Sequence, residues 1–235
     1  MQELKIVNNT SVCGRCIKDS LSKYLSGFKI EITDPGNLIP PQRGYARKLA
    51  GARFLNRKKG LSSLVKDNII NIELKLLKKA KSLNGVIYHG FKYQKILKEI
   101  FPLKDKNTFT VILTDRLLAT PEIEGGHPHV RIAILGYPGI VLTRGIIKGP
   151  ARSRKKDTKD DYIGTLSDER LRDVIPGYIM QTVFYFFLGE SFCDKKGCRL
   201  YNAHWQKDMI KAQLEKPAFC KKHSKMLEYL AEYNI

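Results

Sequence analysis

The stretch IMQTVFYFFL, residues 179–188, is apolar on nearly all sides of a helix. A membrane-spanning helix needs roughly 18 such residues, and this run is shorter. A helix without a polar face has to be buried, which requires other layers of structure around it. The helical pattern covers residues 170–189, and Cys193 and Cys198 follow it closely. The fold therefore has to place a buried helix beside a cysteine-bearing segment.

Strand patterns alternate with helix patterns along the rest of the chain. The predicted strands cover residues 3–9, 28–33 and 85–90, and residues 108–118 and 130–143 supply two or three more buried strands. The predicted helices cover residues 11–27, 44–60, 68–83, 91–101, 170–189, 204–215 and 222–233. This order predicts a mixed α/β layer fold whose C-terminal part is helical. We expect residues 1–165 to form the mixed α/β part, with a basic N-terminal segment, and residues 166–235 to form the helical part, together in one compact unit.

The N-terminal residues lack the basic-then-apolar pattern of a signal peptide. The chain has 5 cysteines, an odd number with short spacings. This usage fits reduced thiols and metal binding better than a disulfide framework. We therefore expect a cytoplasmic protein without a membrane partner.

Two short pairs of metal-ligand residues lie near the C-terminus. Cys193 and Cys198 are separated by four residues, and Cys220 and His223 by two. Each pair can span one edge of a tetrahedron, which is the geometry that structural zinc prefers. Four unrelated residues, with the cysteines merely buried, are the alternative. We favour one structural Zn²⁺ held by all four residues, a site that leaves no position for water or substrate and stabilises the C-terminal helices.

The sequence CGRC contains a further pair, Cys13 and Cys16. This pair could form half of a second metal site, a redox pair at a helix start, or simple packing, and it could compete as a ligand of the zinc. We expect two unliganded thiols.

The formal net charge is +19, from 42 Lys and Arg residues against 23 Asp and Glu residues. Residues 1–60 hold twelve of these basic residues and four of the acidic ones. Such a field attracts polyanions, although a generally basic, solvated surface would give the same composition. We predict RNA, or a ribonucleoprotein such as the ribosome, as the partner. The predicted contact residues are Arg43, Arg47, Lys48, Arg53, Arg57, Lys58, Lys59, Arg152, Arg154, Lys155 and Lys156.

The C-terminal third resembles the archaemetzincins, a branch of the metzincin zinc peptidases. Their signature reads H-E-x-x-H-x-x-G-x-x-x-C-x(4)-C-x-M and is followed by C-x-x-C. Gly189, Cys193 and Cys198 match this register without a gap. Cys220 and His223 match the last pair, with histidine in place of the final cysteine and a slightly longer spacer. The resemblance implies a metzincin-like fold of layered sheet and helices.

The catalytic half of that signature is replaced. The His, Glu and His positions fall on Thr182, Val183 and Phe186, the third metal ligand on Phe192, and the Met-turn methionine on Leu200. A metzincin peptidase needs three ligands, an open coordination position and a carboxylate that takes a proton from the bound water. Phenylalanine and valine supply none of these. We therefore predict a non-catalytic relative of the peptidases.

Residues 112–151 and 177–227 also resemble an uncharacterised archaeal family of metallopeptidase-like proteins, a resemblance that covers most of residues 45–230. This leaves a second hypothesis, a metal-dependent hydrolase whose ligands have moved. Its ligands would come from His127, His129, His89 and His204. We favour a loop rim over a second metal site for the H-x-H pair. Metal analysis separates the hypotheses, because one zinc per chain fits the first and two metals fit the second.

Overall fold

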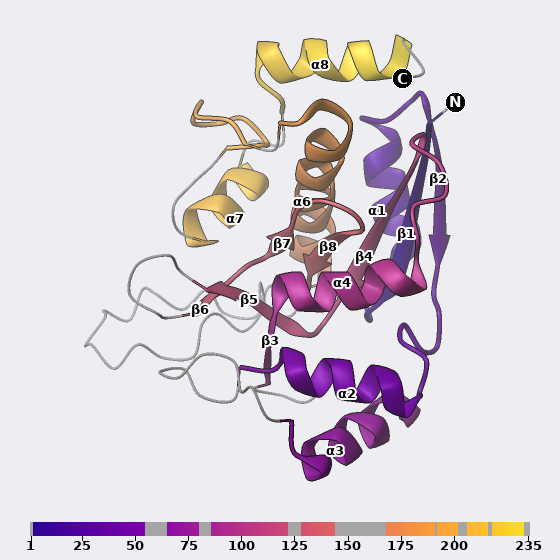
Figure 1. Ribbon diagram of the computed structural model, residues 1–235. Helices are drawn as coiled ribbons and strands as arrows, with labels where there is room; N and C mark the ends of the chain where they lie inside the picture. The colour runs from indigo at the N-terminus through magenta and orange to yellow at the C-terminus, as the bar shows by residue number, and fades with distance from the viewer. Residues whose placement is uncertain are drawn as a thin grey trace, which may run out of the picture.

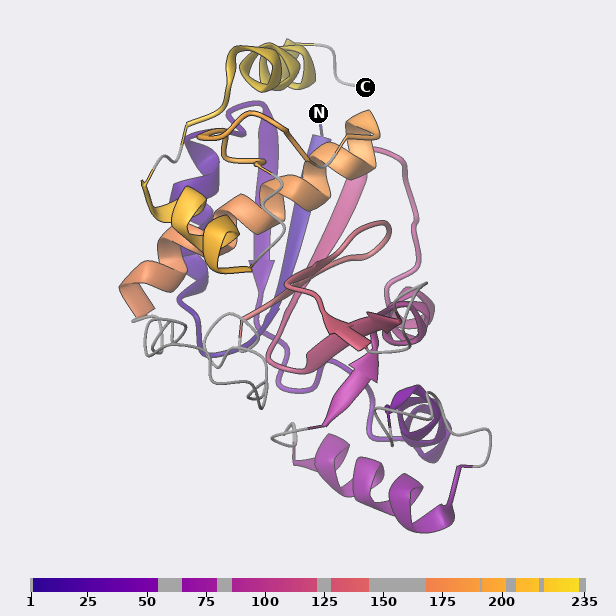
Figure 2. The same ribbon diagram turned by 90° about the vertical axis from the view of Figure 1, so that its left-hand side faces the viewer.

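The computed structural model describes residues 2–54, 65–79, 86–121, 128–143, 168–190, 192–201, 206–215 and 218–232. Helices lie on both sides of a central twisted sheet, as Figures 1 and 2 show. The predicted mixed α/β layer fold is therefore confirmed.

The main sheet has five strands in the order β2-β1-β4-β8-β7. β1 pairs in parallel with β2 and β4, β4 pairs in parallel with β8, and β7 pairs antiparallel with β8. The strands are β1 (Gln2–Asn9), β2 (Phe28–Thr33), β4 (Thr108–Thr114), β7 (Ala133–Ile134) and β8 (Gly139–Leu142). β4 and β8 are buried along nearly their whole length. Parallel strands covered on both faces need such continuous apolar runs.

Successive residues of β4 enter different cores because side chains alternate across a strand. Phe109, Val111 and Leu113 join the core formed with α1 (Gly14–Ser22) and α6 (Asp168–Leu188). Ile112 joins the opposite core. That second core is formed with α2 (Arg43–Ala52), α3 (Asp67–Lys78) and α4 (Gly90–Ile100). Figure 2 shows α6 crossing one face of the sheet.

A smaller sheet has the order β3-β5-β6. Its strands are β3 (Ile87–His89), β5 (Leu117–Pro121) and β6 (Pro128–Val130). β3 and β5 are parallel, and β5 and β6 are antiparallel. This sheet lies beside α2 and α4, and α4 begins at Gly90, directly after β3 (Figure 1).

The C-terminal segment shares the first core. α7 (Gln206–Glu215) and α8 (Lys221–Glu232) follow α6, and Ile210 of α7 is buried in the same cluster as Leu4 of β1. A boundary at residue 165 would therefore fall between segments that pack on one another. Within the described residues, no helix has the length and apolar character needed to cross a membrane.

The helices α1 and α2 are shorter than predicted, and α1 spans Gly14–Ser22 of the predicted range 11–27. The periodicity of residues 44–60 predicts one helix that presents Arg53 and Arg57 on one face, but α2 ends at Ala52. Arg53 is extended and forms an isolated antiparallel bridge with Tyr88, and the N–H of Phe54 donates to the carbonyl of Ile87. Backbone pairing with β3 thus overrides the helical pattern, and Arg57 lies outside the described residues.

Candidate functional site

The predicted zinc ligands come together at the junction of the last helices. Cys193 and Cys198 lie on the loop that follows α6. Cys220 directly precedes α8, and His223 lies in its first turn. The four ligand atoms lie within 4.8 Å of one another. Among the residues that the structure describes, these four form the one such group of three or more metal-ligand side chains.

The spacing of the ligand atoms fits tetrahedral zinc. Two sulfurs that each lie about 2.3 Å from a tetrahedral zinc are about 3.8 Å apart, and a sulfur and a nitrogen are about 3.5 Å apart. The Sγ atoms of Cys193 and Cys220 are 3.8 Å apart. Nδ1 of His223 lies 3.6 Å from Sγ of Cys198 and 3.1 Å from Sγ of Cys220. The predicted zinc cofactor is therefore confirmed, with Nδ1 as the histidine ligand atom.

The loop of the first cysteine pair is folded by its own backbone. Gly197 has a φ of 93°, a left-handed conformation that favours glycine and turns the chain back toward Cys198. The N–H of Lys195 donates to Sγ of Cys193 at 3.4 Å, and the N–H of Cys220 donates to Sγ of Cys198 at 3.5 Å. Backbone donors that point at the sulfurs stabilise the thiolates that zinc requires.

The thiols differ in how readily they ionise. Burial raises the pKa of Cys193 to about 11. Burial opposes ionisation of Cys220 as well, but hydrogen bonds from the backbone and imidazole of His223 and from the neighbouring thiols lower its pKa to about 6. The pKa values of Cys193 and Cys220 are thus shifted in opposite directions, and a divalent cation is the partner that stabilises neighbouring thiolates together.

The other nitrogen of the histidine faces a carboxylate that the sequence reasoning missed. Nε2 of His223 lies 3.5 Å from Oε2 of Glu190, and each oxygen of this carboxylate accepts a hydrogen bond of 2.7 Å from Nζ of Lys222. The side-chain hydrogen bond from Lys222 lowers the pKa of Glu190, so the carboxylate is ionised at neutral pH. A carboxylate on the distal nitrogen fixes the tautomer and orientation of a zinc-bound histidine.

We expect Glu190→Gln to weaken zinc binding by about tenfold, because the amide is a poorer acceptor for the imidazole N–H. Competition with a chromogenic zinc chelator measures this directly. Asp194→Asn is the matched control, because Asp194 is exposed between the two loop cysteines and is not a ligand. Equal zinc affinity in both variants would contradict a positioning role for Glu190.

Aromatic side chains anchor this site to the first core. The ring of His223 meets Phe184 of α6 edge-on, with 5.5 Å between centroids. Phe219 stacks on Phe184 and meets Tyr24 edge-on. The guanidinium of Arg199 lies over the ring of Tyr24 and donates to its hydroxyl at 2.8 Å. The zinc site therefore ties the C-terminal segment to α6 and to the end of α1.

The positions that the archaemetzincin signature assigns to catalysis lie mostly in packed regions. Thr182 is fully buried, and its hydroxyl donates to the carbonyl of Ile179 at 2.7 Å. A Cβ added to Gly139 would lie 2.9 Å from Cβ of Thr182, so α6 touches the β8 backbone here. Val183 is also fully buried. The region is filled by contact between the helix and the sheet.

The remaining positions of that signature are also apolar. Phe186 stacks on Phe109 with 4.4 Å between centroids. Leu200 is fully buried, whereas Phe192 is 41% exposed. Four of the five side chains are hydrocarbons and the Thr182 hydroxyl is bonded to the helix backbone, so none of them supplies the imidazole or carboxylate of the signature.

The predicted RNA-contact residues separate into three groups. Arg43, Arg47 and Lys48 are exposed on α2. Arg53 is 7% exposed and ion-paired with the buried Glu73, so its prediction as a surface contact is wrong. The others lie outside the described residues: Arg57, Lys58, Lys59, Arg152, Arg154, Lys155 and Lys156.

The histidines proposed as moved metal ligands are not brought together where they are described. In the small sheet His89 is in register with Ala119, and His129 with Thr120. Adjacent residues of β5 point to opposite faces, so the two histidines belong to opposite faces of this sheet. His127 and His204 lie outside the described residues.

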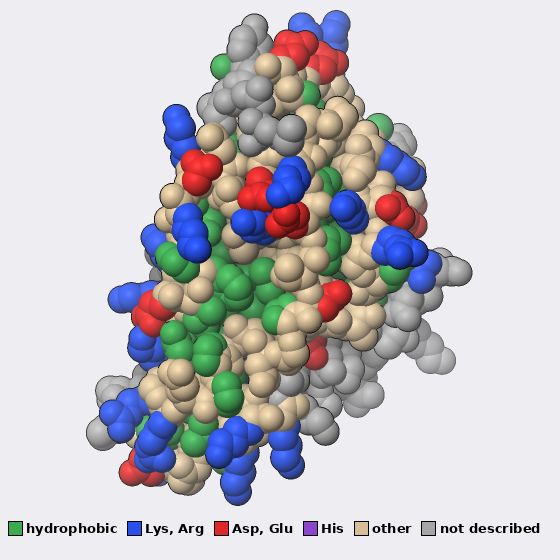
Figure 3. Space-filling model, turned by 90° about the vertical axis from the view of Figure 1, so that its right-hand side faces the viewer, with side chains coloured by type: hydrophobic (Ala, Val, Ile, Leu, Met, Phe, Trp, Pro, Cys, Tyr) green, Lys and Arg blue, Asp and Glu red, His purple; other side chains and the backbone are tan. Residues whose placement is uncertain are grey.

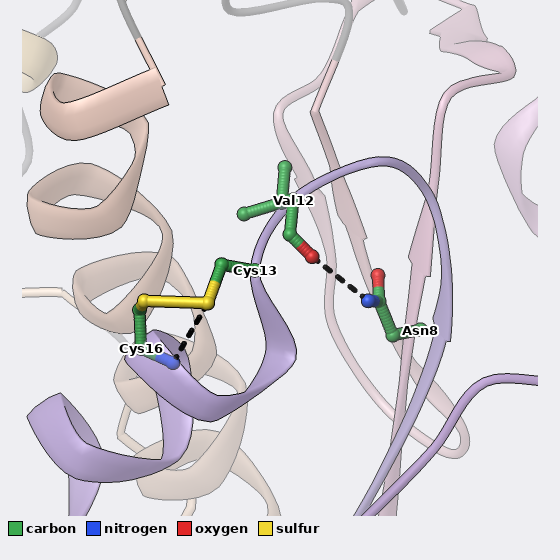
Figure 4. Close-up of a disulfide and its surroundings, with 4 residues drawn as sticks. All are labelled: Asn8, Val12, Cys13 and Cys16. Carbon is green, nitrogen blue, oxygen red and sulfur yellow. Dashed lines mark hydrogen bonds between the residues drawn. A yellow bond between two sulfur atoms is a disulfide. The ribbon is translucent and has the colours of Figure 1, made fainter.

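The cysteines of the CGRC sequence are joined in a disulfide, as Figure 4 shows. The expectation of two free thiols is therefore wrong, because both sulfurs lie in the same first turn of α1, with Cys13 as its N-cap. The C-x-x-C spacing at the start of a helix is sufficient to bring the two sulfurs within bonding distance.

The chain matches two family models that meet near residue 155. Residues 17–159 match a model described as "Family of unknown function (DUF7001)". Residues 151–230 match one described as "Probable metallopeptidase family (DUF6775)". This matched range includes the four predicted zinc ligands. No curated protein matches the sequence.

Two solved structures resemble the fold. Archaemetzincin from Methanopyrus kandleri is 12% identical, with a TM-score of 0.52 over 97% of this chain and 94% of that one. A zinc-dependent peptidase from Methanocorpusculum labreanum (strain Z) is 15% identical, with a TM-score of 0.48 over 96% and 98%. The first likeness confirms the predicted archaemetzincin-like fold. Because the model for residues 17–159 spans more than half of the chain, the protein belongs to the family of unknown function DUF7001.

Proposed function

We propose that this protein is a non-catalytic, zinc-stabilised relative of the metzincin peptidases that binds single-stranded RNA, alone or within a ribonucleoprotein. The observation that carries the proposal is a basic face formed by α2 and α4, which we call the α2–α4 surface. Its exposed basic residues are Arg43, Arg47, Lys48, Lys92, Lys95 and Lys98.

The α2–α4 surface is continuous across two helices. Lys48 of α2 forms an ion pair with Glu99 of α4, which ties the two helices together. On α4 the lysines at 92, 95 and 98 recur at helical spacing and therefore share one face. The exposed lysines of α3 extend the charge, and Figure 3 shows Lys and Arg side chains gathered at the end of the molecule where α2 and α3 lie. A strip of like charge on rigid helices favours a phosphate backbone.

Aromatic rings lie beside these charges. The ring of Phe54 stacks on that of His89 at 5.6 Å between centroids, with 4° between the planes. Phe91 is 55% exposed, and the centroid of its ring lies 5.9 Å from that of His89. Phe91 directly precedes Lys92 in the sequence. Burial lowers the pKa of His89, so the imidazole stays neutral near pH 7. Rings interleaved with cations are how single-stranded RNA is held, because bases stack while lysines contact phosphates.

The non-catalytic part of the proposal is supported by side-chain packing. Thr182, Val183 and Phe186 of α6 occupy the signature positions of the peptidase ligands and base. Thr182 contacts Gly139 of β8, Phe186 stacks on Phe109 of β4, and Val183 is buried in the first core. Water activation by a metzincin-type zinc needs three protein ligands, an open coordination position and a general base. The Cys/Cys/Cys/His quartet supplies four protein ligands, as a structural zinc site does.

We expect the double variant Arg47→Glu/Lys95→Glu to bind RNA at least tenfold more weakly. Each phosphate contact on a single strand contributes about −0.7 to the slope of log K against log salt, so losing two contacts should flatten the slope by about 1.4. Fluorescence anisotropy with a labelled random-sequence RNA, measured across a salt series, gives both quantities. Phe91→Ala should weaken binding about tenfold with little change in salt slope, because stacking contributes about 1–3 kcal/mol per base.

The matched control is Lys211→Glu/Lys225→Glu, which makes the same charge change on exposed residues of α7 and α8. If both double variants lose the same affinity, the α2–α4 surface is not the binding face. If the parent protein neither binds the RNA nor sediments with ribosomes from lysate at low salt, the RNA proposal fails.

The second candidate is a metal-dependent hydrolase, which the family description of residues 151–230 and the archaemetzincin-like fold favour. Metal analysis of the purified protein separates the two. One tightly held zinc per chain and no chelator-sensitive cleavage of a peptide library support the non-catalytic proposal. A second, exchangeable metal together with such cleavage would support the hydrolase.

A further inference from the structure

The Cys13–Cys16 disulfide does not connect separate parts of the fold. Both residues lie at the start of α1, three positions apart in sequence. A disulfide stabilises a protein mainly by closing a loop of the unfolded chain, and the effect grows with loop length. A bridge within one turn closes a very short loop. The disulfide therefore contributes little as a structural crosslink.

The disulfide lies apart from the zinc site. Residues 10–13 connect the carboxyl end of β1 to α1, so the disulfide lies at the carboxyl edge of the main sheet. Figures 1 and 2 show α8 beyond the opposite edge of the sheet and the C-terminal end of α6 close to that edge, and the zinc ligands lie on the loop after α6 and at the start of α8. The three zinc-site cysteines are free thiols in the same structure. The two sulfur sites can therefore react independently.

The surroundings of Cys13 favour its thiolate. Sγ of Cys13 accepts a hydrogen bond from the backbone N–H of Cys16 at 3.3 Å, which Figure 4 shows as a dashed line. The first turn of α1 contains no acidic residue, and the exposed Arg15 stands between the cysteines. A helix N-terminus and a nearby guanidinium stabilise negative charge on sulfur.

The turn that holds the disulfide is fixed and accessible. The side-chain amide of the buried Asn8 donates to the carbonyl of Val12 at 3.0 Å, and the hydroxyl of Thr10 donates to Oδ1 of Asn8 at 2.7 Å. Val12 is itself buried in the first core. Cys13 and Cys16 are partly exposed, so a partner can reach their sulfurs without unfolding of α1.

We propose that Cys13 and Cys16 form a redox-active pair that exchanges with the disulfide of a partner, and that Cys13 is the nucleophile. This activity is independent of RNA binding and of the zinc. The partner is defined by its chemistry as a disulfide, carried either by a low-molecular-weight thiol compound or by a protein.

In the reduced pair, the Cys13 thiol loses its proton to solvent and the thiolate attacks one sulfur of the partner R–S–S–R′. The Cys13–S–S–R bond forms, the partner's S–S bond breaks, and R′–S⁻ leaves and is protonated. Cys16 then loses its proton, and its sulfur attacks Sγ of Cys13. The Cys13–Cys16 bond forms, and R–S⁻ leaves and is protonated. Two electrons pass from the pair to the partner. In the opposite direction, two thiols reduce the Cys13–Cys16 disulfide by the same exchange steps and are themselves joined in a disulfide.

The test uses the zinc-loaded, full-length protein in mixtures of reduced and oxidised glutathione. Alkylation followed by peptide mass spectrometry gives the fraction of Cys13 and Cys16 reduced at each ratio. We expect a reversible two-electron transition within minutes, while zinc content stays at one per chain. A second arm replaces glutathione disulfide with a disulfide-bonded peptide and shows which source the pair accepts. Reaction with either source supports the proposal.

Variants assign the roles. Cys16→Ser should be trapped as a mixed disulfide at Cys13, whereas Cys13→Ser should react about tenfold more slowly at Cys16. Arg15→Glu should slow the reaction of Cys13 several-fold while zinc content and Tm remain those of the parent. A disulfide that is reduced only after denaturation, or reaction with neither disulfide source, would overturn the proposal. Faster trapping at Cys16 than at Cys13 would overturn the assignment of the nucleophile.

Discussion

Cys198→Ser should release the zinc and lower the Tm by about 10–20 °C. Zinc binding by structural sites is coupled to folding and contributes about 10 kcal/mol or more in small zinc domains. In a chain of this size each 1 kcal/mol shifts the Tm by about 2–4 °C, so a loss of about 5 kcal/mol gives the expected shift. Inductively coupled plasma analysis measures the metal, and scanning calorimetry measures the Tm.

The loss of structure after zinc release should begin in the C-terminal helices. His223 packs on Phe184, and Phe219 packs on Tyr24, so freeing the ligands loosens the contact of α8 with α6 and α1. Hydrogen exchange should therefore rise first in α8. Lys196→Ala is the matched control, because Lys196 is exposed in the same loop and contributes no ligand, and its effect should stay within about 0.5 kcal/mol. A Cys198→Ser protein that keeps one zinc and the parent Tm would refute the assignment.

The zinc quartet could be predicted from the sequence because its ligands form two pairs of close neighbours. Cys193 and Cys198 close one turn, and Cys220 and His223 begin one helix, so chain geometry alone places each pair on a tetrahedral edge. Glu190 was not predicted. It faces His223 from 33 positions earlier in the sequence, and only the packing of α8 on the end of α6 brings the two together.

Most strands and helices lie where their periodic patterns predict them, but the topology did not follow from these patterns. The alternation in residues 28–33 predicts β2 with the bounds that the structure has. No feature of the sequence predicts that β1 lies between β2 and β4. Strand order depends on contacts between residues far apart in the chain, and periodicity reports only local environments.

Arg53 illustrates the same limit at one side chain. A basic residue in a basic segment predicts solvent exposure, and Arg53 is instead buried against Glu73. The signal that could have found this pairing is the single acidic residue within the otherwise apolar and basic pattern of residues 72–79. Glu73 lies on the buried face of α3 with Ile70 and Leu77, where an unpaired carboxylate would be unstable.

The second large effect is expected for Glu73→Gln. Glu73 is fully buried between two guanidiniums: Nε of Arg53 lies 2.5 Å from its Oε1, and a nitrogen of Arg116 lies 3.7 Å from its Oε2. The hydroxyl of Tyr88 donates to the same Oε1 at 2.7 Å and accepts from Arg116 at 2.8 Å. Burial raises the pKa of Tyr88, so this hydroxyl stays protonated and remains a donor.

Removing the carboxylate charge takes away the counter-charge that the two buried guanidiniums share. Breaking a buried ion pair by neutralising one partner costs about 3–5 kcal/mol, so the Tm should fall by about 10 °C. Glu99→Gln is the matched control, because it neutralises the exposed partner of Lys48 and should cost less than about 1 kcal/mol. If the two variants unfold at the same temperature, Glu73 does not hold the arginines in place.

This cluster also decides how the basic segment should be tested. Arg53 joins the end of α2 to β3, beneath the α2–α4 surface, so Arg53→Glu would place a second carboxylate beside Glu73 and unfold the region. Its effect on RNA binding would then follow the loss of structure. Arg47→Glu changes an exposed charge on the same helix and should leave the Tm within about 2 °C of the parent. Weaker RNA binding with an unchanged Tm at Arg47, and a lowered Tm at Arg53, is the combination that the geometry requires.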